Sequence, residues 1–152
     1  MIERAHAYDA KEILALQKLV YLSEAAIYND YSIEPLVQPL EEVKAQFIDH
    51  VFLKAVDGET IVGSVRARLI EETCYIGKLI VHSSYQNKGI GKQLMAEMES
   101  CFNTCSRYEL FTGNKSEKNL QLYKKIGYKT FRTKSIDENV SLVYLEKLAG
   151  IQ

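Results

Sequence analysis

The feature that most constrains this sequence is a glycine-containing loop between an apolar run and an amphipathic segment. The run Leu79-Ile80-Val81 is typical of the end of a buried strand, and the loop Gln86–Gly91 follows it. A helix is predicted from this loop to about Phe102. The first turn of a helix has backbone N–H groups without partners and the positive end of the helix dipole. This strand, loop and helix therefore predict an anion-binding site.

The residues of the loop suit an anion but not the common nucleotide motifs. Gly89 and Gly91 have no Cβ to keep a phosphate from the backbone, while Lys88 and Lys92 add positive charge and Gln86 can donate from its amide. The Lys-Ser or Lys-Thr pair of a P-loop is missing, and Gly-x-Gly-x-x-Gly is not completed after Gly91. ATP and NAD are therefore disfavoured as ligands.

The rest of the chain predicts one mixed α/β domain over residues 1–152, with the order β-α-α-β-β-β-α-β-α-β-β. Asp9 is expected to cap the first helix, which should bury a stripe of Ile13, Leu16, Leu19, Val20 and Ile27. Asp57-Gly58 is a hairpin signal. The expected strands are Met1–Ala5, Val51–Val56, Thr60–Ile70, Thr73–Val81, Tyr108–Thr112, Tyr128–Thr133 and Val140–Lys147. The expected helices are Ala10–Tyr28, Pro39 through Phe47, the one after the glycine loop, and Ser116–Ile126.

Composition excludes several classes of function. With 19 Lys and Arg against 20 Asp and Glu, the net charge of −1 argues against binding long nucleic acid. No apolar run approaches the roughly 20 residues that span a bilayer, and the N-terminus does not resemble a signal peptide, so we expect a cytoplasmic protein without a membrane partner. The odd number of cysteines, without a Cys-x-x-Cys pair, predicts buried thiols and no metal site; they are Cys74, Cys101 and Cys105.

Two segments together resemble a known family. The pattern Leu79-Ile80-Val81-His82-(x)3-Gln86-(x)2-Gly89-x-Gly91 resembles motif A of the GNAT superfamily of N-acetyltransferases, and Asn119 to Tyr128 resembles its motif B. The two segments also stand in the family's order and at about its spacing. The resemblance implies an acyl-CoA N-acyltransferase fold with two splayed central strands, here Thr73–Val81 and Tyr108–Thr112, and the pantetheine arm of acetyl-CoA between them.

The resemblance also implies which residues hold acetyl-CoA. The backbone of Leu79, Ile80 and Val81 is expected to pair with the pantetheine amides. The residues expected around the pyrophosphate are Gln86, Asn87, Lys88, Gly89, Ile90, Gly91 and Lys92. Asn119 is a further candidate contact, although many family members have an asparagine where this chain has Ser116, a residue that also fits a helix cap. The motif B contact is thus open between Ser116 and Asn119.

Acetyl transfer needs an acid for the departing thiolate, and Tyr123 is the residue that motif B implies. A phenol is protonated at neutral pH, since its ordinary pKa is about 10. The base is open. Some family members have a glutamate where this chain has Tyr75, and the alternatives are Glu71, Glu72, Asp30 or a chain of water molecules. His82 follows the cofactor strand directly, which favours a role in the loop's structure.

In the resembling fold the acceptor amine enters opposite the cofactor. The residues expected there are Tyr28, Asp30, Tyr31 and Tyr75, with Arg66 and Arg68 as further candidates. The sequence therefore predicts direct transfer from acetyl-CoA to a primary amine of a small molecule or peptide, because no cysteine lies near the reactive ends of the motifs. The alternative is a non-catalytic acyl-CoA-binding or regulatory module. Family resemblance also suggests a homodimer.

Overall fold

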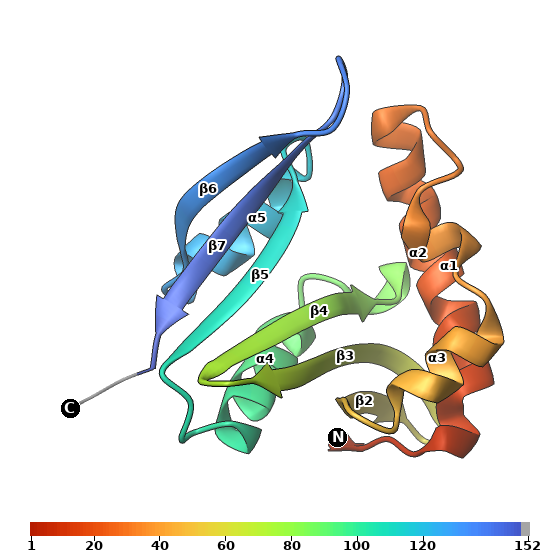
Figure 1. Ribbon diagram of the computed structural model, residues 1–152. Coiled ribbons are helices and arrows are strands. Elements are labelled where there is room, and N and C mark those ends of the chain that lie inside the picture. The colour runs from red at the N-terminus through yellow and green to blue at the C-terminus, as the bar shows by residue number, and fades with distance from the viewer. Residues whose placement is uncertain (150–152) are drawn as a thin grey trace.

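The computed structural model describes residues 1–149, and they form one mixed sheet with helices on both sides (Figure 1). The strands are β1 (Ile2–Arg4), β2 (Val51–Asp57), β3 (Thr60–Ile70), β4 (Thr73–Val81), β5 (Arg107–Gly113), β6 (Lys129–Ser135) and β7 (Ser141–Leu148). The helices are α1 (Ala10–Tyr28), α2 (Glu34–Val37), α3 (Leu40–Gln46), α4 (Ile90–Cys101) and α5 (Glu117–Lys125), with short 3-10 turns at Ala7–Asp9 and Ser83–Tyr85. This order confirms the predicted fold class and adds the short helix α2, which has Pro35 in its first turn.

The sheet has the order β1-β2-β3-β4-β5-β7-β6. Neighbouring strands are antiparallel except at the centre, where β4 and β5 run parallel. The last strand, β7, lies between β5 and β6, because it pairs with both.

The two parallel strands touch at one end only. Their pairing runs from Thr73 opposite Arg107 to Tyr75 opposite Glu109. Beyond Tyr75 the strands separate, which Figure 1 shows as a wedge that opens from the β3–β4 hairpin toward α1. The register of β3 and β4 also shifts on this stretch, where Lys78 has a φ of 52°. Such a bulge bends a strand, and the predicted splay of the central strands is confirmed.

Two apolar cores hold the helices on opposite faces of the sheet. Helix α4 buries Leu94, Met95 and Met98 in one core. Helices α1 and α3 bury residues that include Ile13 and Val43 in the other. Each such side chain contributes about 1.5–3 kcal/mol when fully buried. These cores fix the helices on either side of the central gap.

Helix α1 departs from its predicted stripe. Ile13 and Leu16 are buried, but Leu19 and Ile27 are 53% and 48% exposed. The second half of the helix passes the gap between β4 and β5 (Figure 1), so there is less sheet beneath it to cover. Near its end the buried residues are Ala25 and Tyr28.

Two smaller expectations are also corrected. Asp9 makes no side-chain hydrogen bond to the first turn of α1, because its carboxylate accepts from the His6 N–H and pairs with Lys54 at 3.0 Å. Of the three cysteines, Cys74 and Cys105 are buried but Cys101 is exposed at the end of α4. Within residues 1–149 no helix has the length and apolarity needed to cross a membrane.

Candidate active site

The glycine loop places the start of α4 against an open groove. Asn87 and Gly89 adopt left-handed φ values of 63° and 84°, and the helix begins at Ile90. The Gln93 N–H donates to the Gly89 carbonyl, so the N–H groups that precede it in the first turn are free of helical partners. Gly89 meets the need for a positive φ without strain.

This loop groove has a volume of about 1000 Å³ and is bordered by the loop, α1 and α5. Of the predicted cofactor residues, those that line it are Leu79, Val81, Gln86, Asn87, Gly89, Ile90, Gly91, Lys92 and Asn119. Further lysines come from the α5 side, namely Lys115, Lys118 and Lys125. The groove thus combines a helix N-terminus with several cations, which favours an anionic ligand.

Two predicted cofactor residues do not line the loop groove. The side chain of Ile80 is buried in the core under α1, because alternate residues of a strand face opposite ways. The ammonium of Lys88 instead lies 5.3 Å from the centre of the Tyr85 ring. Ile80 can therefore take part through its backbone only.

That backbone is available because of the splay. Past Tyr75, the edge of β4 that faces β5 has no strand partner within the described chain. Unpaired strand edges present a row of N–H and C=O groups that an extended amide-containing ligand can pair with.

A second cavity, of about 650 Å³, lies on the other side of the gap. We call it the aromatic pocket, because it is lined by Tyr21, Tyr28, Tyr75, Phe111 and Tyr123. Asp30, Arg66 and Arg68 also line it, as predicted for the acceptor side. Tyr31, which was also predicted for the acceptor side, does not line the pocket, and its side chain is 58% exposed.

The loop groove and the aromatic pocket share a border. The residues that line both are Tyr21, Glu24, Leu79, Ser116 and Asn119. A ligand in the groove and a ligand in the pocket would therefore meet beside α1 and the start of α5.

Tyr123 lies on the pocket side of this border. It is 7% exposed, and burial raises the pKa of its phenol above the ordinary value, with Tyr21 and Glu24 adding to the shift. The phenol thus keeps its proton at neutral pH. Its side chain lines the aromatic pocket, so a ligand there can reach the phenol.

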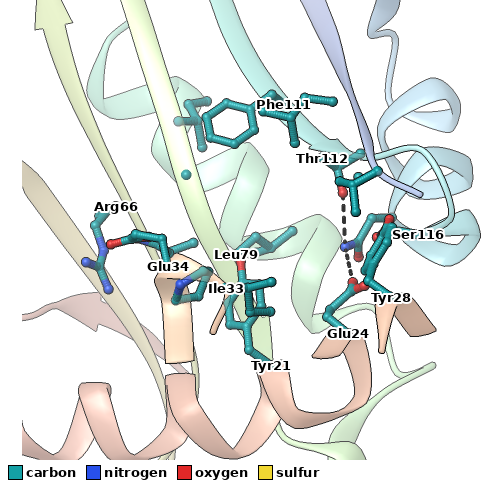
Figure 2. A pocket seen from close by; sticks show the side chains of 18 of the residues that line it. Tyr21, Glu24, Tyr28, Ile33, Glu34, Arg66, Leu79, Phe111, Thr112 and Ser116 are labelled. Atoms are coloured by element: carbon teal, nitrogen blue, oxygen red, sulfur yellow. Dashed lines mark hydrogen bonds and ion pairs between the residues drawn. The ribbon is translucent and has the colours of Figure 1, made fainter. Parts of the chain in front are cut away.

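A set of polar side chains joins α1 to α5 across the gap. Glu24 accepts from the Ser116 hydroxyl at 2.8 Å and from the Asn119 amide at 3.0 Å. The Tyr28 hydroxyl lies 2.9 Å from the Ser116 oxygen and accepts from the Lys115 N–H. Figure 2 shows Glu24 projecting from α1 toward Thr112 and Ser116. We call this set, Glu24, Tyr28, Ser116 and Asn119, the α1–α5 bridge.

The bridge includes a residue that the sequence analysis missed. Tyr21, Glu24 and Tyr28 are three and four positions apart, so they share one face of α1. This spacing is the feature of the sequence that could have indicated Glu24 as a neighbour of the two tyrosines. Ser116, a candidate for either the motif B contact or a helix cap, makes no side-chain capping bond and donates to Glu24 instead; like Asn119, it lines the loop groove.

Arg66, a residue of β3, lines the aromatic pocket. It is 3% exposed, and its guanidinium donates to Gln46 and Gln17, each at 2.6 Å, and stacks on Phe52. Burial lowers its pKa to about 10, so it remains a cation at neutral pH. These bonds hold α1 and α3 to the sheet beneath the pocket.

The acids named as candidate bases occupy different places. Glu71 and Glu72 lie at the β3–β4 turn, away from both cavities, and Glu72 accepts from Ser106 at 2.7 Å. Asp30 lines the aromatic pocket, but its carboxylate is bonded to the N–H and hydroxyl of Ser32, which lowers its pKa. His82 accepts from the Ser84 N–H at 3.1 Å, a bond that shapes the loop.

Residues 16–128 match the model of the acetyltransferase (GNAT) family. The chain belongs to the GNAT acetyltransferase family. No curated protein sequence matches it. Among residues 1–149, no group of His, Cys, Asp and Glu side chains is arranged to hold a metal ion.

Several solved structures share the whole fold. The smu.2055 protein of Streptococcus mutans UA159 matches with a TM-score of 0.84 and 16% identity, and 99% of each chain is covered. An aminoglycoside 6'-N-acetyltransferase complexed with coenzyme A has a TM-score of 0.80 and 17% identity, with 100% of this chain and 98% of that one covered. The PaiA N-acetyltransferase of Thermoplasma acidophilum, in complex with coenzyme A, has a TM-score of 0.70 and 20% identity, with 97% and 98% covered. At these identities the likeness establishes the fold.

Proposed function

We propose that this GNAT-family protein transfers an acetyl group from acetyl-CoA to a primary amine of a small molecule or peptide. The cofactor would lie in the loop groove, with its pyrophosphate at the start of α4 and its pantetheine arm along the free edge of β4. Similar solved structures with coenzyme A bound support this choice of cofactor. The free N–H groups after Gly89 and the surrounding lysines fit its negative charges.

The acceptor amine would enter through the aromatic pocket. Its nitrogen attacks the acetyl carbonyl carbon, so a C–N bond forms and the C–S bond breaks. Tyr123 donates its proton to the departing sulfur, and a proton lost by the amine nitrogen returns to the phenol directly or through water. Because burial raises the pKa of its phenol, Tyr123 starts each cycle with its proton in place.

The observation that carries the proposal is the shared border of the two cavities. A groove suited to an anionic, amide-containing cofactor ends where an aromatic pocket begins, and Tyr123 lies beside that border. A module that only binds acyl-CoA needs the groove but has no use for a second cavity that leads to the same point.

The test is thiol release from acetyl-CoA across a panel of polyamines, amino acids, aminoglycosides and peptides, with mass spectrometry of the products. We expect acetyl-CoA to bind and at least one primary amine to gain an acetyl group on nitrogen. Binding of acetyl-CoA with no release across the whole panel would instead support a non-catalytic acyl-CoA-binding module. The cytoplasmic location and the homodimer stay predictions, to be checked by fractionation and by the mass in solution.

A further inference from the structure

One acid, Glu24, stands among the five residues that border both cavities. Its two carboxylate oxygens are held separately, one by the Ser116 hydroxyl and the other by the Asn119 amide. Both partners belong to the start of α5, one turn or more before Tyr123. The carboxylate is therefore fixed beside the place where the two ligands would meet.

In the hydrogen bonds around Glu24, every proton is donated toward its carboxylate. Ser116 donates its only hydroxyl proton to Glu24, so Tyr28 is the donor in the bond between Tyr28 and Ser116, and the Tyr28 oxygen accepts from the Lys115 N–H. Asn119 donates as well. Glu24 is thus an acceptor in every bond it makes here, and each oxygen keeps a further lone pair for another donor. An ammonium group, which can only donate, is the matching ligand.

The other acids of the aromatic pocket are engaged elsewhere. Asp30 is bonded to Ser32 within its own loop, and Asp137 accepts from the N–H groups of residues 139 and 140. Glu34 pairs with Lys78 at 2.8 Å. None of these three borders the loop groove.

We infer that Glu24 is a catalytic residue that binds the acceptor as an ammonium ion and removes a proton from it. This inference rests on the proposed function and names its substrate class: amines that arrive as cations. The ammonium gives one proton to the Glu24 carboxylate, which passes it to water, and the neutral amine then attacks the acetyl carbon. The second proton leaves the nitrogen as the amide forms and replaces the one that Tyr123 gives to sulfur.

The test is Glu24→Gln, assayed with the most active amine of the panel. Glutamine keeps an acceptor oxygen for the bridge but has no charge. We expect the KM for the amine to rise and kcat to fall, with kcat/KM for the amine lower by about 100-fold, as for loss of an acid–base group. The dissociation constant for acetyl-CoA should change by less than about twofold, because the groove contacts remain.

Two further variants separate this role from a structural one. Ser116→Ala removes a bond of the bridge but leaves the Glu24 charge, so it should cost much less kcat/KM than Glu24→Gln. Glu97→Gln, on an exposed acid of α4 that borders neither cavity, should change kcat/KM by less than about threefold. A purely structural bridge predicts the opposite ranking, with Ser116→Ala the more harmful and the less heat-stable.

Failure of the inference is distinct from failure of the proposed function. If wild-type protein acetylates no amine, the proposed function is wrong and the inference falls with it. If wild-type protein is active and Glu24→Gln matches it in kcat/KM for the amine, the inference alone is overturned.

Discussion

The loop groove and the aromatic pocket meet at the same residues, but the chain builds them in different ways. Much of the groove wall comes from one continuous stretch, from Leu79 to Lys92, and the ligand groups it offers are chiefly backbone N–H and C=O. The pocket gathers single side chains from α1, α2, β3, β4, β5, α5 and the β6–β7 connection. The groove depends on backbone conformation, whereas the pocket depends on which side chains the fold brings together. Substitutions in the pocket can therefore change the acceptor while the cofactor site stays intact.

The two cavities also differ in the charges that line them. The groove is lined by four lysines against two acids, an excess of cations that suits phosphate; the residues are Lys92, Lys115, Lys118 and Lys125, with Glu24 and Glu117. The pocket is lined by both acidic and cationic side chains, and some of them form ion pairs, such as Lys78 with Glu34. The groove therefore favours an anionic ligand, whereas the pocket offers charges of both signs to its ligand.

The largest effect is expected for the variant Tyr123→Phe, which tests whether a residue on the pocket side of the border takes part in acetyl transfer. In Tyr123→Phe the ring still fills its buried place, but the acid is lost. We expect kcat to fall by about 100-fold, with the dissociation constant for acetyl-CoA within about twofold of wild type. Stopped-flow thiol release and calorimetry measure the two quantities. Tyr144→Phe, which borders neither cavity, is the control, and an unchanged kcat in Tyr123→Phe would remove the phenol from the mechanism.

The next effect should fall on the groove alone. Valine at Gly89 must adopt a φ of 84°, which costs about 1–2 kcal/mol for a residue with a Cβ and disturbs the first turn of α4. We expect acetyl-CoA to bind about tenfold more weakly. Gly58→Val is the matched control, since Gly58 has a φ of 63° in the β2–β3 turn, away from both cavities. Both variants should lose similar stability, so equal acetyl-CoA affinities in the two would contradict the loop's role.

The same contrast explains what the sequence could predict. The groove is formed largely by neighbours in sequence, so the spacing of Leu79, Gln86 and Gly91 could indicate that they share one site, and all three line the groove. The side-chain directions there could not be predicted: the Ile80 side chain faces the core, which is compatible with its predicted backbone role, and the Lys88 ammonium lies over a tyrosine ring. Those outcomes depend on neighbours that a motif does not specify.

The pocket was predicted only in part because it is assembled by long-range contacts. Tyr28, Asp30 and Tyr75 were expected there, but Glu24 was not, since its partners are more than 90 positions away on α5. The place of β7 between β5 and β6 is a similar case, because hydrophobic alternation predicts a strand but not its neighbours. Tyr31 belongs to the same loop as Asp30, yet the fold turns it outward.

A smaller effect should separate the bridge from the groove. Tyr28→Phe removes the hydroxyl that bonds Ser116 and the Lys115 N–H, so this N–H loses its acceptor and Ser116 keeps only its bond to Glu24. We expect a loss of about 1–3 kcal/mol in the free energy of unfolding and an amine KM that rises a few-fold, with acetyl-CoA binding unchanged. Urea denaturation and steady-state kinetics are the measurements. Tyr31→Phe, on an exposed residue, should show neither change; a weaker acetyl-CoA affinity in Tyr28→Phe would mean that the bridge also supports the groove.

The smallest expected effect is that of alkaline pH on the pocket. Burial raises the pKa of Tyr123 above about 10, the ordinary value for a phenol, so the protonated acid persists up to that pH. At saturating amine, kcat should therefore show no fall due to Tyr123 between pH 7 and about 10. The free energy of unfolding should follow the same pH range. Because the pKa of Tyr123 is higher in the folded than in the unfolded state, its contribution to stability is complete below about pH 10 and is lost as pH rises toward the folded-state pKa. Burial also raises the pKa of Tyr21, Tyr108 and Tyr128, so unfolding monitored by circular dichroism should become easier only above that pH. A fall in kcat with a midpoint near pH 8, absent from the residual activity of Tyr123→Phe, would show that the phenol is more acidic than its burial implies.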